Sequence, residues 1–327
     1  MKKVFMIGGA GFLGSSFLRN INEQENEVYP CDVNEVNHKN FIFMDISKPE
    51  TMKSLMNADI ILNLAAVHRD DIKPISKYDD VNVKGAKNIC DAATQYNVNK
   101  IIFISSVAIY GFAPKNTNEE GEANYFNDYG RTKYLAEQIF KKWQLENPNE
   151  RSLVIIRPTV IFGEGNRGNV FNLINAIASK KFVMFGDGSN KKSMAYVENV
   201  SSFISNRLNS KPGIHIYNYV DKPDLTIKEL VTFSRETLFR KKTLGIRLPK
   251  FLGYLVGYLF DFLSILIRRK LSISSVRVKK FFGESSFDAS KKDKIFKPSF
   301  SLKEGLKRTI TYEFLEDNSD KRTFDTE

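Results

Sequence analysis

A glycine-rich turn at the start of the chain constrains its fold more than any other feature of the sequence. Residues 2–14 read KKVFMIGGAGFLG, so an apolar run leads directly into Gly8, and Gly11 and Gly14 follow at intervals of three. This order predicts a buried strand, a tight turn and a helix. Glycines at these places let the backbone turn sharply, approach a pyrophosphate and pack the helix closely on the strand. The first helical amides would then face the phosphates.

A second short strand supports this interpretation. Residues 27–31 are followed by Asp32, eighteen residues after Gly14. A carboxylate at that distance accepts hydrogen bonds from the ribose hydroxyls of a bound dinucleotide. It would also repel a 2′-phosphate, so we expect NAD rather than NADP as the cofactor.

Composition indicates an intracellular enzyme of ordinary size. With 327 residues and 42% hydrophobic content, the chain can bury a large core, as one large domain or as a domain with a smaller lobe. Cys31 and Cys90 suit a reducing cytoplasm rather than a disulfide scaffold. The three histidines lack the spacing of a zinc site, so no metal is expected. Because the first residues enter a core strand, we also expect no signal peptide.

Basic residues are concentrated in one stretch. The net charge is +11, and residues 240–282 hold eleven Lys and Arg residues against one acid, Asp261. The remainder of the chain is close to neutral. This distribution argues against a general nucleic-acid-binding surface and favours a local anionic partner.

Strand and helix patterns alternate through the first half of the chain. Short apolar runs alternate with longer amphipathic segments, which predicts a doubly wound, parallel α/β sheet of the Rossmann type with right-handed crossovers. Ligands bind such sheets at the carboxyl ends of the strands. The further strands are expected at 41–44, 59–64, 100–104 and 152–157, and helices at 48–57 and 76–97.

Three side chains near the fifth strand suggest acid/base chemistry. Ser106 follows this strand, and Tyr129 and Lys133 stand four residues apart, on one face of a predicted helix. A tyrosine has an ordinary pKa near 10, so it needs help to exchange a proton with a sugar or alcohol hydroxyl at neutral pH. A neighbouring lysine stabilises the phenolate, and the serine can hydrogen-bond the reacting oxygen.

Taken together, these motifs resemble the extended short-chain dehydrogenases/reductases, the NAD-dependent epimerase/dehydratase family that acts on nucleotide sugars. The resemblance covers nearly the whole chain, including a smaller C-terminal substrate lobe. It implies that Tyr129 is the acid/base, that Lys133 lowers the pKa of this tyrosine, that Ser106 orients the substrate and that Asn82 supports the site. The implied cofactor contacts are Gly8, Gly11, Phe12, Leu13, Gly14, Asp32, Asp45, Ile46, Leu64, Ala65, Ala66, Tyr129, Lys133 and Pro158.

One departure from the family pattern narrows the reaction. Sugar 4,6-dehydratases of this family carry Thr-Asp-Glu after the fifth strand, where this chain has Ser106, Val107 and Ala108. Valine and alanine cannot transfer the protons that water elimination requires. The sequence therefore favours epimerisation or reduction over dehydration.

Substrate contacts are expected in the second half of the chain. Asn169 and Lys192 stand near positions that bind the sugar diphosphate in related enzymes, and Arg277 is a substitute for a missing arginine motif. Lysine meets a phosphate as a point charge without a bidentate fork. The identity of the nucleotide, and even a free nucleotide substrate, stays open at this point.

The stretch 250–270 is the most individual part of the sequence. It reads KFLGYLVGYLFDFLSILIRRK, an apolar run with basic residues at both ends and Asp261 inside it. A membrane-spanning helix needs about 20 apolar residues, so this run is short for that purpose. Two interpretations compete: a buried helix or dimer contact, and a helix that lies in the membrane surface with its basic flanks on anionic headgroups.

We therefore expect NAD-dependent hydride transfer at C4 of a UDP-linked or lipid-linked N-acetylated hexose, as a 4-ketoreductase or 4-epimerase of surface-polysaccharide synthesis. The alternatives are a membrane-associated hydroxysteroid-like dehydrogenase and a non-catalytic NAD-binding scaffold. A homodimer in the cytoplasm, at the inner face of the membrane if 250–270 binds lipid, is expected. The expected parts are an NAD-binding core at 1–165, a substrate lobe mainly at 166–316 with 193–220 returning to the core, and a flexible tail at 317–327.

Overall fold

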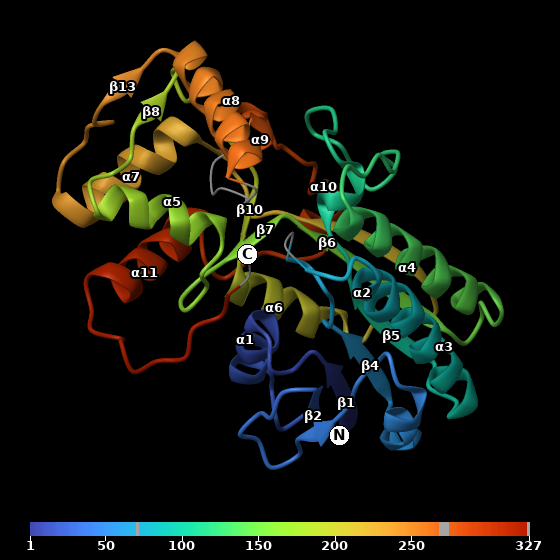
Figure 1. The fold of residues 1–327 in the computed structure, drawn as a ribbon. Helices are drawn as coiled ribbons and strands as arrows, with labels where there is room; N and C mark the ends of the chain where they lie inside the picture. Colours follow the sequence, from blue (N-terminus) through green and yellow to red (C-terminus); the bar gives the residue numbers. More distant parts are fainter. Residues whose placement is uncertain (70–71, 268–274, 326–327) are drawn as a thin grey trace.

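The protein is built on a seven-stranded sheet, as the computed structural model of residues 1–69, 72–267 and 275–325 shows. All neighbouring strands are parallel, in the order β11-β6-β5-β4-β1-β2-β3 (Figure 1). This confirms the predicted Rossmann-type sheet. The strands are β1 (Lys2–Ile7), β2 (Asn26–Asp32), β3 (Ile42–Phe43), β4 (Ile60–Asn63), β5 (Lys100–Ile104), β6 (Ser152–Pro158) and β11 (Gly213–Tyr219).

Both faces of the sheet are buried. Successive residues of a strand point to opposite faces, so Val4 and Met6 of β1 enter one hydrophobic cluster and Phe5 and Ile7 enter another. Helices α1 (Phe12–Asn20) and α6 (Val197–Arg207) cover the first face. On the other face lie the 3₁₀ helix η1 (Pro49–Asn57), α3 (Gly85–Gln95) and α4 (Asp128–Leu145). Two-sided burial explains why the strands read as continuous apolar runs.

The long helix expected at 76–97 differs from the prediction in one respect. It is divided into α2 (Ser76–Tyr78), a π-helical turn η2 (Asp79–Lys84) and α3. The backbone stays helical throughout, but a π-turn inserts one extra residue per turn and shifts the direction of the side chains that follow. Asn82 lies within this turn.

The second lobe packs beside the carboxyl ends of the strands (Figure 1). It contains α5 (Asn169–Ala178), α7 (Ile227–Phe239), α8 (Lys250–Leu266), α9 (Ser275–Phe282) and the short strands β8 (Met184–Phe185) and β13 (Arg247–Leu248). The short helix α10 (Ser290–Asp293) instead packs against β11 of the main sheet. The remaining short pairs are β7 (Val160–Phe162) with β10 (Met194–Tyr196), and β9 (Lys191–Lys192) with β12 (Leu225–Thr226). A small core of Ile177, Met184, Ile227 and Val231 holds the lobe together.

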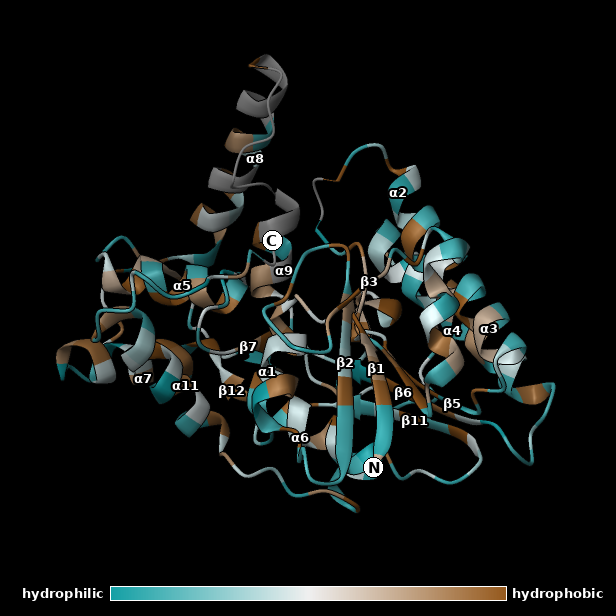
Figure 2. Ribbon diagram, turned by 90° about the horizontal axis from the view of Figure 1, so that it is seen from below, coloured by the Kyte–Doolittle hydropathy of each residue, from teal (hydrophilic) through white to brown (hydrophobic). Residues whose placement is uncertain are grey.

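Helix α8 extends away from the rest of the molecule (Figure 2). Gly253 lets one face of this helix pack closely on Phe282 of α9 and on Phe185. On the other face, Phe251 and Leu255 expose 66% and 62% of their surface. Within the described ranges, no helix combines the length and the apolar character needed to cross a bilayer.

The C-terminal part returns to the core. Ser301 caps α11 (Leu302–Phe314) by accepting a hydrogen bond from the Glu304 amide. The chain then folds back to the middle of the molecule (Figure 1). Phe324 forms an isolated bridge with Asn166, so this polar segment contacts the rest of the chain near its end.

Candidate active site

The opening turn has two kinds of glycine. Gly8 has φ +89°, and a Cβ there would lie 2.7 Å from the Ala65 amide, while a Cβ on Gly14 would lie 2.7 Å from the carbonyl oxygens of Gly8 and Gly9. These two positions need glycine for the fold itself. Gly11 differs, because its Cβ would meet only the Gly8 carbonyl, at 3.2 Å, and otherwise point into open space.

This open space fits a dinucleotide. Gly11 is the N-cap of α1, and no side chain caps the helix, so the amides of its first turn are available to a phosphate. Asp32 accepts hydrogen bonds from the backbone amides of Ala10 at 3.0 Å and Asn34 at 2.9 Å. These bonds hold the carboxylate at the end of β2, beside the turn, where ribose hydroxyls would reach it.

The other expected cofactor residues follow the ends of neighbouring strands. The Asp45 carboxylate accepts hydrogen bonds from the amide and hydroxyl of Ser47; burial raises its pKa, but these bonds and Lys48 lower the pKa more. Ile46 is buried against Gly85 of α3. Leu64, Ala65 and Ala66 leave β4 beside the glycine turn, and the buried Pro158 ends β6.

Ser106 and Tyr129 come together at the end of β5. Ser106 caps the short helix η3 (Val107–Tyr110) by accepting the Ala108 amide at 3.1 Å, and its hydroxyl hydrogen-bonds the Tyr129 phenol. The start of α4 reaches this turn because Gly130 has no side chain; a Cβ there would lie 2.5 Å from the Ala108 carbonyl oxygen. Asn127 caps α4 by accepting the Gly130 amide.

The electrostatics of this pair suit proton exchange. Burial raises the pKa of the Tyr129 phenol to about 12, and the hydrogen bond with Ser106 acts in the opposite direction. Without a further positive charge, Tyr129 is therefore protonated at neutral pH. A cation beside the phenol would lower its pKa and allow it to act as a base.

Lys133 supplies such a charge from the same face of α4. Its ammonium is buried, donates a hydrogen bond to the Ile104 carbonyl at 2.6 Å and lies 5.9 Å from the centre of the Tyr129 ring. Burial lowers the pKa of Lys133 to about 7, against the opposing effect of Glu137. The protonation of Lys133 thus changes close to neutral pH.

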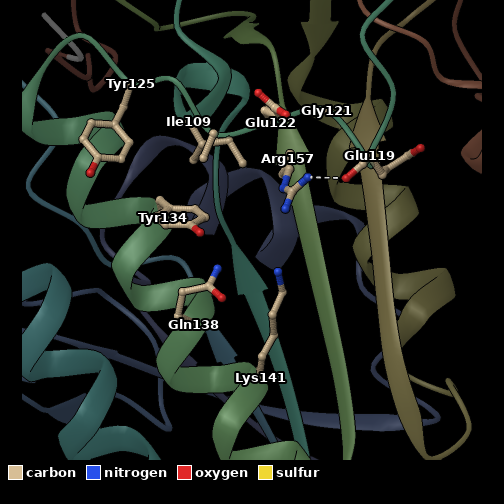
Figure 3. A pocket seen from close by; sticks show the side chains of 10 residues that line it. Ile109, Glu119, Gly121, Glu122, Tyr125, Tyr134, Gln138, Lys141 and Arg157 are labelled. Carbon is tan, nitrogen blue, oxygen red and sulfur yellow. Dashed lines mark hydrogen bonds between the residues drawn. The ribbon is translucent and has the colours of Figure 1, made fainter.

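A buried ion pair lies beneath this lysine, and the sequence did not point to it. Arg157 of β6 binds both carboxylate oxygens of Glu137, at 2.8 and 2.6 Å, and also donates to the Tyr110 hydroxyl and the Glu119 carbonyl. Arg157 and Lys141 line a cavity of about 550 Å³ beside α4 (Figure 3). Tyr129 and Ser106 do not line this cavity, so it is separate from the reacting groups.

Asn82 connects three parts of the site from the π-helical turn. Its side-chain oxygen accepts the Val67 amide at 2.8 Å, and its amide group donates to the Val67 carbonyl and the Thr132 hydroxyl, each at 2.9 Å. Thr132 precedes Lys133, while Val67 belongs to the segment after β4. Asn82 therefore joins the cofactor side of the site to the catalytic helix.

The three expected substrate residues have different surroundings. Asn169 opens α5. The ammonium of Lys192 donates to the Gly283 carbonyl at 2.7 Å, and burial lowers its pKa to about 8 against the effect of Glu284. The side chain of Arg277 lies outside the described residues. In the described part of the chain, no three His, Cys, Asp or Glu residues form a metal-binding cluster.

Comparison with known proteins is consistent with this geometry. The profile of the NAD dependent epimerase/dehydratase family matches residues 4–218. An N-acetyl-alpha-D-glucosaminyl-diphospho-ditrans,octacis-undecaprenol 4-epimerase from Escherichia coli O157:H7 is 43% identical over 336 residues, which cover 99% of both chains. A UDP-N-acetylglucosamine 4-epimerase from Bacillus cereus superimposes with a TM-score of 0.75 at 17% identity, over 95% of this chain and 98% of that one. A UDP-glucose 4-epimerase from Thermus thermophilus, solved with NAD, gives 0.71 at 18%, with the same coverage.

Proposed function

The chain belongs to the NAD-dependent epimerase/dehydratase family, and we propose that it is a 4-epimerase of N-acetylglucosaminyl diphospho-polyprenol. The observation that carries the reaction class is the hydrogen-bonded Ser106–Tyr129 pair with the Lys133 ammonium on the same helix face. NAD supplies the acceptor and donor of the hydride at C4. The absence of acid and base at Val107 and Ala108 argues against dehydration.

Tyr129, Ser106 and Lys133 have separate roles in the reaction at C4. The Tyr129 phenolate takes the proton of the 4-hydroxyl as the ketone forms, and returns it to the alkoxide when the configuration has inverted. Ser106, which hydrogen-bonds the phenol, would also hydrogen-bond this substrate oxygen and hold it beside the phenol. The protonated Lys133 stabilises the phenolate. For inversion, the keto sugar must present its other face while it stays in the site.

A lipid-linked substrate is supported by the surface of α8. Phe251, Leu255, Tyr258 and Leu259 lie at positions i, i+4, i+7 and i+8 of this helix, so they share one face, and each exposes more than half of its surface. A helix with an exposed apolar face, within a stretch rich in lysine and arginine, is typical of binding to the membrane surface. A soluble nucleotide sugar would not require such a surface.

We therefore assign the segment 250–270 to peripheral contact with the bilayer that contains the substrate. We propose that the enzyme acts at the inner face of this membrane, where the diphosphate headgroup of the substrate would reach the carboxyl ends of the strands. Two aromatic side chains, Phe112 and Phe126, lie exposed on the loop before α4, and the Lys279 ammonium of α9 lies 5.4 Å from the centre of the Phe112 ring. Helix α9, which packs on the opposite face of α8, thus contacts the loop that leads into Tyr129.

A homodimer is part of the same proposal. Sedimentation of the purified protein with NAD tests it. A sedimenting species of twice the 37.4 kDa chain mass would support it, and a species of one chain mass would oppose it.

The decisive assay compares two N-acetylglucosamine substrates, one linked to a lipid and one linked to a nucleotide, with the same protein. Vesicles with N-acetylglucosaminyl diphospho-undecaprenol and a solution of UDP-N-acetylglucosamine are each incubated with NAD-loaded enzyme, and the galacto product is measured by mass spectrometry after hydrolysis and chromatography. We expect conversion of the lipid-linked sugar and little conversion of the nucleotide sugar. Tyr129→Phe should lower the rate by about 10²- to 10⁴-fold. Conversion of the nucleotide sugar alone would disprove the proposed substrate.

A paired variant separates membrane contact from chemistry. Leu255→Ser/Leu259→Ser should slow conversion in vesicles but leave conversion of a water-soluble, short-chain analogue unchanged. Leu145→Ser, which removes an exposed leucine at the end of α4, is the control and should behave as the wild type in both assays. Equal rates of the double variant and the wild type in vesicles would contradict the role of α8.

A further inference from the structure

The C-terminal segment lies on the glycine turn, although the two are 312 residues apart in sequence. The guanidinium of Arg322 donates a hydrogen bond from Nη2 to the Ala10 carbonyl at 3.0 Å. The ring of Phe324 lies 5.7 Å from the ring of Phe12, the first residue of α1. The segment thus contacts the turn at the place where the phosphates of a dinucleotide are expected.

This position is fixed by backbone hydrogen bonds as well as by side chains. The Phe324 amide donates to the Gly165 carbonyl at 2.8 Å, and the Arg167 amide donates to the Phe324 carbonyl at 2.8 Å. The Phe324 ring packs against the main hydrophobic cluster, and the Arg322 guanidinium lies 5.0 Å from its centre. Arg322 is therefore held on the turn from two sides.

The charge of Arg322 has no counterpart in the described part of the protein. Its guanidinium forms no ion pair with a carboxylate there, whereas its neighbour Lys321 pairs with Asp320. Only one of the five N–H groups of Arg322 is used by Ala10, so others remain for a ligand. Guanidinium groups bind phosphate through two parallel hydrogen bonds.

We propose that Arg322 is a ligand of the NAD diphosphate and that residues 322–324 form a strap that retains the cofactor. Phe324 anchors the strap between the turn and the loop at 165–167. Arg322 neutralises part of the phosphate charge, which otherwise only the α1 amides would bind. A 4-epimerase needs this retention, because the hydride taken from C4 must return to the same sugar. Loss of the reduced cofactor would leave a keto sugar in the site.

The test measures how fast NAD leaves the loaded protein. Enzyme loaded with labelled NAD is mixed with excess unlabelled NAD, and the label that stays bound is followed over time by rapid gel filtration. We expect Arg322→Ala to release NAD about tenfold faster or more, and Arg322→Lys to give an intermediate rate because lysine keeps the charge without the fork. Lys321→Ala is the matched control and should retain NAD as the wild type does.

A second readout distinguishes a cofactor ligand from a structural clamp. Melting temperatures are measured for each variant with NAD removed and with NAD in excess. If Arg322 binds NAD, Arg322→Ala should reduce the rise in melting temperature that NAD causes and leave the NAD-free protein unchanged. Equal release rates in Arg322→Ala and the wild type, or an equal loss of stability with and without NAD, would overturn the proposal. Neither measurement depends on the sugar substrate, so failure here and failure of the proposed function can be told apart.

Discussion

Each glycine of the opening turn meets different neighbours, so substitutions there should have separable effects. A Cβ on Gly14 would lie 2.7 Å from two backbone oxygens that cannot move without disturbing the turn. We expect Gly14→Ala to lower the free energy of unfolding by about 2 kcal/mol, the typical result of overpacking. Denaturation in urea with NAD absent measures this change.

Gly11→Ala is the informative counterpart. Its new methyl group would press only on the Gly8 carbonyl, at 3.2 Å, and would otherwise occupy the space next to the free α1 amides. Stability without NAD should change little, while NAD affinity, measured by calorimetry, should fall about tenfold or more. A large loss of stability together with normal NAD affinity would mean that this space does not receive the cofactor.

The hydrogen bond between Ser106 and Tyr129 should be visible in the pH dependence of turnover. This bond lowers the pKa of the phenol against the effect of burial. Ser106→Ala removes this lowering effect, so the pKa of the phenol rises. Because the phenolate is the active base, activity increases with pH through this pKa, and the rising limb of kcat/KM should move to higher pH in the variant. If the rising limb of kcat/KM keeps its position and only the plateau is lower, Ser106 orients the sugar without changing the pKa of Tyr129.

At the scale of elements, the π-helical turn η2 places Asn82 where it can join two parts of the site. Asn82→Ala removes the hydrogen bonds that the Asn82 side chain makes with the Val67 amide, the Val67 carbonyl and the Thr132 hydroxyl. A buried polar group left unsatisfied costs about 1–3 kcal/mol. We expect Asn82→Ala to lower the free energy of unfolding by about 2 kcal/mol or more, measured by urea denaturation. The exposed Asn57, at the end of η1, is the control, and its alanine variant should differ from the wild type by less than about 0.5 kcal/mol.

The same element shows which local structure can be predicted from sequence. β5 has the predicted bounds 100–104, because an apolar run of this length between polar residues has few alternatives in a parallel sheet. The π-turn could not be predicted in this way. Its hydrogen bonds shift by one residue, but most of the apolar pattern of 76–97 comes from α3, which keeps a regular buried face.

For the whole molecule, prediction was limited by contacts between distant residues. The spacing of Tyr129 and Lys133 is local, and it was recognised from the helix period. Two other contacts depend on how the chain packs: the pairing of Arg157 with Glu137, and the contact of Arg322 with the glycine turn. The spacing of these residues in the sequence does not predict them. The contacts of Phe324 near the C-terminus, through its ring and two backbone hydrogen bonds, also could not be read from the polar composition of that segment.

The exposed face of α8 makes a prediction about the molecule as a unit. Burial of a leucine side chain in an apolar environment contributes about 1.5–3 kcal/mol, so two exposed leucines can decide whether a protein of this size stays on a membrane. We expect the wild type to float with vesicles that contain anionic lipid. We expect Leu255→Ser/Leu259→Ser to bind these vesicles at least about tenfold more weakly. Leu145→Ser serves again as the control.

Salt and lipid charge then separate the two contributions to this binding. Eleven Lys and Arg residues in 240–282 should make the affinity fall as salt rises from about 0.05 to 0.5 M, because screening shortens the reach of their attraction to anionic headgroups. The apolar contribution is not screened, so the wild type should keep more of its binding at high salt than the double variant. If α8 instead packs against a second copy of the chain, the wild type will not float at low salt, and the double variant will change the sedimenting mass rather than vesicle binding. The membrane contact and the dimer contact thus predict opposite results for one pair of substitutions.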